Sequence, residues 1–263
     1  SGKGRGEAMI ELKELRAGYG TFEVLHGISI AFPPGQVTAI AGPNGCGKST
    51  LLRAVLGMAQ RMGGQVLFDG RPVEELSARE IAQRAAYMPQ DRPVPSISVR
   101  RMALHGRFPY LSYPRHYRRE DYDIVDAALR RADALELADR PLPELSGGQR
   151  QRAYLAMVLA QGAGTVFMDE PTAFLDIRHQ FDVMDTARSL AGDGRAVAIV
   201  THDLALALRR ADRLAIMQDG RLRMLGSPDE VFESGAVDEV FGVRLRRVDT
   251  PDGPQYYFAQ EAF

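Results

Sequence analysis

The feature that most constrains this chain is a glycine-rich segment, residues 42–50, with the sequence GPNGCGKST. An apolar run at 37–41 precedes it and is typical of a buried parallel strand, and residues 48–56 have the character of a helix. Glycines let backbone N–H groups converge on phosphate oxygens, and the N-terminus of the following helix adds partial positive charge. The segment therefore predicts a phosphate-binding loop, and the flanking strand and helix argue against a chance glycine turn.

The side chains inside this loop are suited to a nucleoside triphosphate. Lys48 is expected to neutralise the β- and γ-phosphates, and the Ser49 hydroxyl is expected to ligate Mg²⁺. Cys46 permits two interpretations, a redox-sensitive thiol or a small residue whose backbone matters, and we adopt the second. The loop residues expected to hold the nucleotide are Gly42, Pro43, Asn44, Gly45, Cys46, Gly47, Lys48, Ser49 and Thr50.

The rest of the sequence alternates strand-like and helix-like segments, which indicates a parallel sheet with covered faces. Two early segments, 10–15 and 24–32, alternate apolar and polar residues and predict antiparallel strands with one covered face. A length of 263 residues is near the upper size for one core, so one domain with lobes is expected. Further strands are expected at 65–68, 85–89, 165–168, 196–201, 214–217, 244–248 and 255–258, and helices at 77–84, 99–105, 120–134, 147–161, 177–190, 204–211, from 228 and from 237.

Two acidic residues, Asp169 and Glu170, follow the apolar strand expected at 165–168. Acids at the C-terminal edge of a parallel sheet lie where ligands bind. We therefore expect Asp169 to hold Mg²⁺ through water and Glu170 to polarise the attacking water as a general base. Acids at strand ends are common, so this interpretation depends on the phosphate loop that precedes them.

A second anion-seeking segment opens the helix expected at 147–161. Ser146, Gly147, Gly148 and Gln149 combine a hydroxyl, two glycines and the N–H groups of a helix start. An ordinary helix cap with a flexible turn is the alternative. Two phosphate-seeking helix starts in one chain favour a nucleotide enclosed between two copies of that chain.

Together these segments resemble the ATP-binding subunit of ABC (ATP-binding cassette) transporters, over residues 10 to about 258. The resemblance implies an α/β fold, a P-loop NTPase (RecA-like) parallel-sheet core with an antiparallel β subdomain and an inserted α-helical subdomain. Residues 9–226 are expected to form a single ATPase domain, with its helical subdomain at about 91–160. Residues 1–8 are expected to be a disordered tail, and 227–263 a C-terminal extension of the same domain.

The resemblance also assigns roles to single residues. It implies that the signature LSGGQ, which contains residues 146–149, completes the ATP site of the partner subunit. Tyr19 matches an aromatic side chain that stacks on adenine, and His202 matches a histidine that touches the γ-phosphate. Gln90 matches a glutamine that contacts Mg²⁺ and the attacking water and senses the membrane partner. Asp176 matches a loop that crosses to the other subunit, although Ala173-Phe174 departs from the small pair usual before it.

The cofactors that the resemblance implies are ATP and Mg²⁺. Its implied partners are a second ATPase subunit in a homodimer, an integral membrane permease in contact with residues near 91–117, and a periplasmic or extracellular substrate-binding protein. The expected location is peripheral, at the cytoplasmic face of the bacterial inner membrane. No run of about 18 apolar residues is present, a single cysteine favours a reducing compartment, and a formal charge of -1 gives no pull toward nucleic acid.

The class of importer depends on two shorter resemblances. The sequences LDIRHQ at 175–180 and HGRFPY at 105–110 resemble importers of iron(III)–siderophore complexes, with haem and cobalamin importers as alternatives. A soluble ABC ATPase of DNA maintenance or translation usually carries two cassettes or a long inserted coiled coil, and this chain has neither pattern. A lone phosphotransferase or nucleotide switch leaves the signature and Gln90 unexplained.

Overall fold

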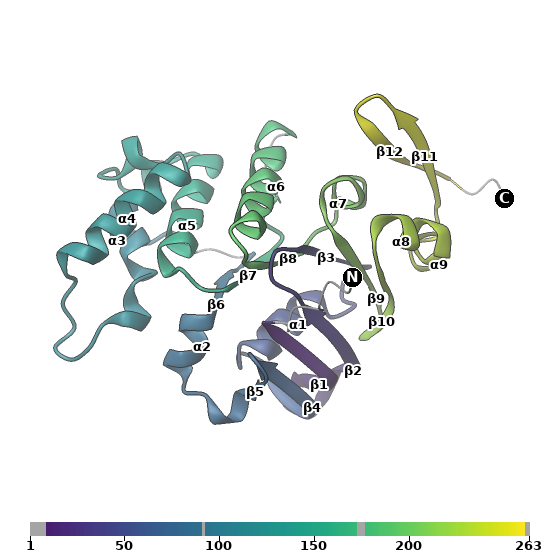
Figure 1. Cartoon of the computed structure of the whole chain (residues 1–263), viewed down its shortest axis with the longest axis horizontal. Helices are drawn as coiled ribbons and strands as arrows, with labels where there is room; N and C mark the ends of the chain where they lie inside the picture. Colours follow the sequence, from purple (N-terminus) through teal and green to yellow (C-terminus); the bar gives the residue numbers. More distant parts are fainter. Residues whose placement is uncertain (1–8, 91–92, 173–176, 261–263) are drawn as a thin grey trace, which may run out of the picture. The chain divides into compact units, whose positions relative to one another are not determined.

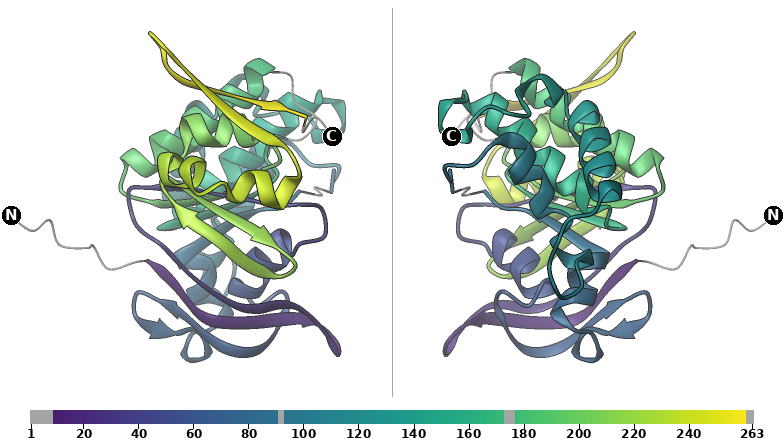
Figure 2. Two further views of the ribbon diagram at one scale, coloured as in Figure 1. Left: turned by 90° about the vertical axis from the view of Figure 1, so that its right-hand side faces the viewer. Right: turned by 90° about the vertical axis from the view of Figure 1, so that its left-hand side faces the viewer.

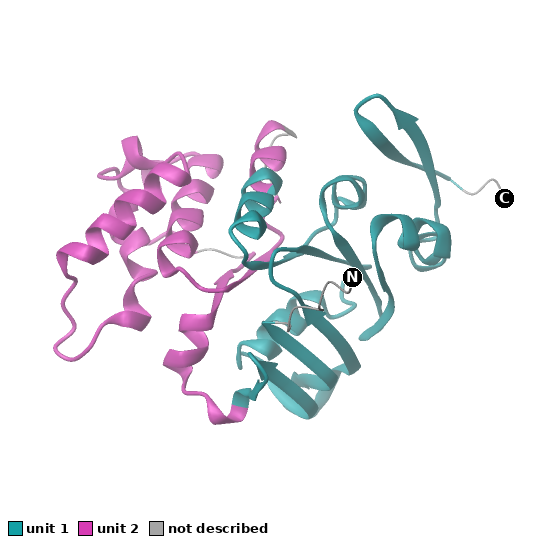
Figure 3. Ribbon diagram, viewed as in Figure 1, with its two compact units in different colours: residues 1–73, 184–263 teal, residues 74–183 magenta. Residues whose placement is uncertain are grey.

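The computed structural model describes residues 9–90, 93–172 and 177–260 of the chain, and Figure 1 labels its helices and strands. The chain divides into two compact units, shown in Figure 3. Unit 1 comprises residues 1–73 and 184–263, and unit 2 comprises residues 74–183. The tail expected at 1–8 and the predicted site residue Asp176 lie outside the described residues.

Unit 1 contains four adjacent strands in the order β10-β9-β3-β8. Strands β3 (Val37–Ala41), β8 (Ala196–Val200) and β9 (Arg213–Gln218) are parallel, and β10 (Arg221–Gly226) is antiparallel to β9. Every residue of β3 and β8 is buried, as expected for apolar strands covered on both faces. The register pairs Ile40 with Val200, so the C-terminal ends of β3 and β8 meet at one edge.

The second sheet of unit 1 is antiparallel, with the order β2-β1-β4-β5. It consists of β1 (Ile10–Tyr19), β2 (Phe22–Phe32), β4 (Gln60–Phe68) and β5 (Arg71–Pro72). Strand β4 begins at Gln60, five residues earlier than the sequence pattern indicated. The reason is a bulge: Gly64 has a φ of 77°, and a β-carbon there would lie 2.1 Å from the Glu14 carbonyl oxygen.

The helices of unit 1 cover its sheets and carry the end of the chain. They are α1 (Lys48–Val55), α7 (Leu204–Arg210), α8 (Pro228–Ser234) and α9 (Ala236–Phe241), with most of α6 (Ile177–Gly192). A hairpin of β11 (Arg244–Thr250) and β12 (Gly253–Ala259) follows. Figure 2 shows this hairpin, in yellow, extending beyond α8 and α9. An edge-to-face contact between Phe232 and Tyr256, with ring centroids 6.0 Å apart, attaches it to α8.

Unit 2 contains two parallel strands and most of the helical insertion. Strands β6 (Ala85–Met88) and β7 (Thr165–Asp169) pair from Ala85 with Thr165 to Met88 with Met168. The helices are α2 (Ala78–Arg84), α3 (Val99–His105), α4 (Arg119–Arg131) and α5 (Gly147–Gln161). Short 3-10 turns occur at η1 (Val73–Glu75), η2 (Phe108–Tyr110), η3 (Leu135–Leu137) and η4 (Leu142–Glu144). Helix α4 stops before the expected residue 134 because Asp133 has a φ of 51°.

The segment after α3 is fixed against α5 by close packing and by hydrogen bonds. A β-carbon at Gly106 would lie 2.2 Å from the Met157 carbonyl oxygen, so only glycine allows this approach. The Arg107 side chain donates to Asp121 Oδ1 at 3.0 Å and to the Ala160 carbonyl at 3.0 Å. The Arg107 and Asp121 side chains are 12% and 10% exposed, so this ion pair is a nearly buried tie between the segment after α3 and α4.

Candidate functional site

The predicted phosphate loop follows β3 and opens α1, as the sequence indicated. Gly45 and Gly47 have φ values of 79° and 103°, a backbone conformation that favours glycine. A β-carbon at Gly47 would also lie 2.8 Å from the Leu25 side chain. A β-carbon at Gly42 would lie 2.2 Å from the Met217 carbonyl oxygen. The chain's own conformation and packing therefore require these three glycines.

Backbone hydrogen bonds attach this loop to the neighbouring hairpin. The Gly220 N–H donates to the Cys46 carbonyl at 3.0 Å, and the His26 N–H donates to the Gly220 carbonyl at 2.9 Å. Gly220 lies in the turn between β9 and β10, and His26 lies on β2. The loop is therefore held from outside by two other segments of unit 1.

Lys48 places a buried ammonium group inside the loop. Lys48 is only 5% exposed, and its Nζ donates to the carbonyls of Gly42 at 2.8 Å and Pro43 at 3.0 Å. An ammonium group has three N–H donors, so these bonds use two of them. The arrangement concentrates positive charge where the N-terminus of α1 also contributes a partial positive charge.

Cys46 is buried on the inner side of the loop. Its residue is 5% exposed, and its Sγ would lie 2.7 Å from a β-carbon at Gly42. Burial raises the pKa of the thiol, more than the charge of Lys48 lowers it. A thiol with a raised pKa is a weak nucleophile at neutral pH.

Three predicted site residues of unit 2 come together at the ends of β6 and β7. Gln90 Nε2 donates to Glu170 Oε2 at 2.6 Å. Asp169 is fully buried, and the Tyr87 hydroxyl donates to its Oδ2 at 3.0 Å. Glu170 has a φ of 48°, which is uncommon for a residue other than glycine.

Tyr87 is a site residue that sequence reasoning missed. The signal was a single hydroxyl in a short apolar strand, three residues before Gln90. Its meaning depends on the pairing of Tyr87 with Phe167, which aligns the two strand ends. That register is not readable from the sequence.

The predicted second anion-seeking segment begins α5 with a capping box. Gln149 N–H donates to Ser146 Oγ at 3.3 Å, and Ser146 N–H donates to Gln149 Oε1 at 3.0 Å. Gly147 and Gly148 have no positive φ. A β-carbon at Gly147 would meet no described atom within 4 Å, and one at Gly148 would meet only the His179 ring, at 3.6 Å. Neither glycine is required by the conformation or packing of the described residues.

The remaining predicted residues are found in unit 1. Tyr19 is 45% exposed at the end of β1, opposite Phe22, which is 72% exposed. His202 is exposed and follows β8 by two residues. Because the Thr201 N–H donates to the Ile40 carbonyl at 3.1 Å, His202 lies at the sheet edge where β3 leads into the phosphate loop.

The order of these motifs identifies the class of protein. The sequence model of the ABC transporter family matches residues 25–173, and this chain therefore belongs to the ABC transporter family. Membership makes the chain an ATP-binding ATPase whose hydrolysis is coupled to transport. Among the described residues, no helix combines the length and apolar character that crossing a membrane requires.

Curated relatives cover most of the chain. A probable siderophore transport system ATP-binding protein of Bacillus subtilis (strain 168) is 36% identical, over 94% of this chain and 90% of its own length. The ferric enterobactin transport ATP-binding protein of Escherichia coli (strain K12) is 36% identical over 93% and 91%. A hemin import ATP-binding protein of Streptomyces coelicolor (strain ATCC BAA-471 / A3(2) / M145) is 42% identical over 90% and 84%.

Solved structures confirm the predicted fold class. The chain resembles cbiO1 of Clostridium perfringens, part of the ABC transporter complex cbiONQ, with a TM-score of 0.77, 29% identity and coverage of 88% of this chain and 93% of that one. A putative metal-chelate type ABC transporter in an inward-facing conformation gives a TM-score of 0.83 and covers 97% of this chain and 98% of that one. At 23% identity, this second likeness shows the fold alone.

Proposed function

We propose that this chain hydrolyses MgATP as a homodimer and thereby powers the import of iron(III)–siderophore complexes through a membrane permease. The observation that carries the proposal is the contrast between two glycine pairs. Gly45 and Gly47 are required by positive φ values, whereas Gly147 and Gly148 have no such requirement. Glycine in a helix costs about 1 kcal/mol relative to alanine, so Gly147 and Gly148 need a reason outside the chain.

A nucleotide held by a second copy supplies that reason. Ser146 satisfies the N–H of Gln149, so the first-turn N–H groups of Gly147 and Gly148 remain for an external acceptor. Helix α5 is 15 residues long, and its N-terminus favours an anion. Phosphate oxygens fit this site, and a side chain at either glycine would stand between them and the helix.

The other half of the nucleotide site belongs to unit 1. We assign the triphosphate to the N–H groups of residues 42–50 and to Lys48. We assign the adenine ring to Tyr19, and a further contact with the γ-phosphate to His202. The exposed ring of Tyr19 and the exposed imidazole of His202 support these assignments. Asp176 is assigned to the contact between the two subunits by resemblance only.

The proposed hydrolysis uses the carboxylate of Glu170. Glu170 accepts a proton from water as the water oxygen attacks the γ-phosphorus, and the bond from that phosphorus to the bridging oxygen of ADP breaks. Gln90, bonded to Glu170 at 2.6 Å, orients this carboxylate and the water. By resemblance we assign Mg²⁺ to Ser49, Asp169 and Gln90, whose side chains each carry an oxygen of the kind that Mg²⁺ prefers, and the ion would neutralise charge on the phosphates when bound. The hydrogen bond from Tyr87 to one oxygen of Asp169 supports this fit, because it keeps the carboxylate oriented.

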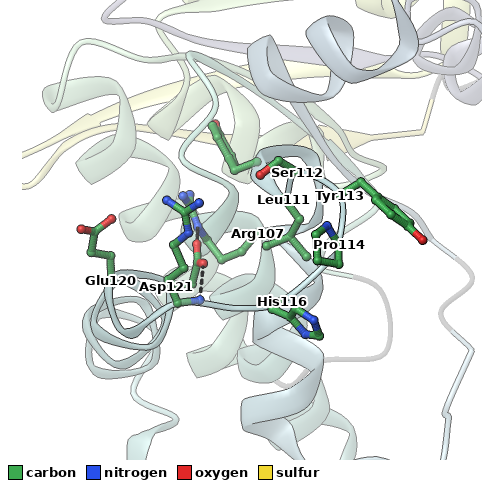
Figure 4. A pocket seen from close by; sticks show the side chains of 10 residues that line it. Arg107, Leu111, Ser112, Tyr113, Pro114, His116, Glu120 and Asp121 are labelled. Atoms are coloured by element: carbon green, nitrogen blue, oxygen red, sulfur yellow. Dashed lines mark hydrogen bonds and ion pairs between the residues drawn. The ribbon is translucent and has the colours of Figure 1, made fainter.

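A membrane permease is the partner that membership of the family implies, and we propose that it contacts residues near 91–117. The C-terminal part of that segment borders a cavity of about 410 Å³, shown in Figure 4, between the loop after α3 and the start of α4. Tyr113 is 95% exposed beside it. Arg115 stacks over the Phe108 ring at 4.5 Å, which adds a positive charge to this aromatic surface.

We further propose the arrangement of the whole system. The dimer lies at the cytoplasmic face of the bacterial inner membrane, and a periplasmic or extracellular substrate-binding protein delivers the chelate to the permease. Residues 9–226 form one ATPase domain with a helical subdomain at about 91–160, and residues 227–263 extend it. The structural likeness over 97% of the chain supports the inclusion of this extension.

The transported substrate is assigned from relatives. Two relatives named for siderophore and enterobactin transport are similar over 94% and 93% of the chain, and the motif LDIRHQ at 175–180 is part of that region. Haem is the second candidate because the hemin import relatives reach 42% identity.

Growth of a deletion strain on single iron sources tests this function. We expect growth to fail on a ferric siderophore, to be restored by the wild-type gene, and to stay absent with Glu170→Gln. Removing a general base lowers turnover by about 10²–10⁴-fold, so purified Glu170→Gln should bind ATP and hydrolyse it at that lower rate. Loss of growth on haem or cobalamin alone would assign the chain to that substrate, and unchanged hydrolysis by Glu170→Gln would remove Glu170 from its role.

A further inference from the structure

Two side-chain hydrogen bonds connect β6 and the residues just after it to two acids, Asp169 at the end of β7 and Glu170 directly after it. Tyr87 donates to Asp169 at 3.0 Å, and Gln90 donates to Glu170 at 2.6 Å. Tyr87 lies on β6, and Gln90 follows it by three residues. Resemblance to the family predicted a role for Gln90, whereas nothing predicted one for Tyr87.

Asp169 is the acid that most needs orientation. It is 0% exposed at the end of a strand whose five residues are all buried. A carboxylate has two oxygens, and a hydrogen bond from the Tyr87 hydroxyl engages Oδ2. This hydrogen bond fixes the orientation of the carboxylate, and a carboxylate that holds a metal, directly or through water, is usually itself held by such hydrogen bonds.

We infer that Tyr87 is a positioning residue that aims the Asp169 carboxylate at the nucleotide-bound Mg²⁺ through the 3.0 Å hydrogen bond between them. The inference rests on the proposed role of Asp169. It adds that strand β6 controls both acids, since the same strand leads directly to Gln90. The segment proposed to contact the permease, near residues 91–117, follows Gln90 in the sequence.

The Tyr87→Phe variant tests this inference because it removes one oxygen atom and keeps the ring. The measured quantity is the Mg²⁺ concentration that half-saturates the binding of a fluorescent ATP analogue, with no turnover required. A single hydrogen bond of this kind changes an equilibrium by about three- to tenfold, so we expect that rise in the half-saturating Mg²⁺ concentration. Binding of the analogue without Mg²⁺ should be unchanged.

Tyr154→Phe is the matched control. The Tyr154 hydroxyl also donates within unit 2, to the backbone carbonyl of Pro93, and its residue is 3% exposed. This substitution should lower stability and leave the half-saturating Mg²⁺ concentration unchanged. An equal shift of the Mg²⁺ dependence in both variants would assign Tyr87 a structural role only and overturn the inference.

Asp169→Asn separates the inference from the proposed function on which it rests. If Asp169→Asn leaves the Mg²⁺ dependence unchanged, the proposed role of Asp169 fails. If Asp169→Asn changes it and Tyr87→Phe does not, only the role of Tyr87 fails. In the double variant we expect no further shift from Tyr87→Phe, because the hydroxyl acts through Asp169. Additive shifts would contradict a shared route.

Discussion

The glycines of the phosphate loop and those of the α5 start belong to the same kind of motif but have different physical origins. Gly42 and Gly47 are fixed by contacts inside unit 1, at 2.2 Å to a carbonyl oxygen and 2.8 Å to a side chain for an added β-carbon. Gly147 and Gly148 have helical backbones, and an added β-carbon would meet no described atom at Gly147 and only the His179 ring, at 3.6 Å, at Gly148. The first pair is explained by folding, whereas nothing among the described residues requires the second pair, for which we propose a ligand held with a partner subunit. Substitutions should therefore separate stability from assembly.

The largest effect on stability is expected for Gly42→Ala. The new β-carbon would overlap the Met217 carbonyl oxygen, so the backbone at one of these two positions must move. We therefore expect the free energy of unfolding to fall by about 3 kcal/mol. Urea unfolding measures this change. Gly45→Ala is the control, since its position has a φ of 79° but no atom within 4 Å, and it should lose only about 1 kcal/mol. Equal losses would mean that the close approach at Gly42 has no energetic weight.

Asp121→Asn is expected to have the next largest effect, and it acts on unit 2. Burial raises the pKa of Asp121, but the Arg118 N–H and the Arg107 guanidinium outweigh it, so the net pKa is lowered. A lowered pKa contributes stability above the ordinary pKa of the group, and that stability is lost as pH falls through the lowered value. Asp121→Asn should cost about 2 kcal/mol at pH 7 and flatten the acid side of the stability curve. An acid response identical to that of the wild type would contradict this assignment.

Gly148→Ala tests the other side of the comparison. Alanine favours helix, so the free energy of unfolding should rise by up to about 1 kcal/mol. ATP-dependent dimers of the Glu170→Gln variant, measured by sedimentation, should nevertheless disappear. Gly192→Ala is the matched control, because Gly192 lies in α6 and a β-carbon there would meet no described atom within 4 Å. It should give a similar gain in stability and leave dimers intact. Dimers that survive Gly148→Ala would place the second half of the nucleotide site elsewhere.

The smallest effect is expected for the rate of thiol alkylation at Cys46. The thiol is buried and its pKa is raised, so reaction with iodoacetamide at pH 7 should be about tenfold or more slower than for a free thiol. Because the pKa is raised, the rate should continue to increase with pH beyond the range where a free thiol levels off. Once modified, the loop cannot accept the added volume, and ATP binding should be lost. Rapid alkylation with retained ATP binding would show that Cys46 is not packed against Gly42.

Much of the parallel core could be predicted because its signals are local. The strand at Val37–Ala41 is entirely apolar, and the glycine-rich loop after it has few other uses. The helix expected at 77–84 begins with a capping box of Ser77 and Glu80, a signal that is likewise local because the two residues are three apart. The features that were missed depend on pairing between distant segments. The bulge at Gly64 hid the start of β4, and the contact of Tyr87 with Asp169 requires the register of β6 on β7.

Strand β10 was missed for a different reason. The turn before it is Asp219-Gly220, with φ values of 48° and 70°, and this dipeptide is the usual signal for a two-residue hairpin. The following run, RLRMLG, is short and lacks a clear alternation of apolar and polar residues. The turn signal alone was sufficient to expect a hairpin there, because the preceding strand was already predicted.

The attachment of the phosphate loop to that same hairpin has a consequence for how a nucleotide binds. Two backbone hydrogen bonds, at 3.0 Å to the Cys46 carbonyl and at 2.9 Å from His26, hold Gly220 between the loop and β2. A loop ordered in advance loses little conformational entropy when a ligand arrives, so more of the contact energy remains as affinity. Association of a nucleotide with unit 1 should accordingly follow a single kinetic phase proportional to nucleotide concentration, with no slow isomerisation of the loop.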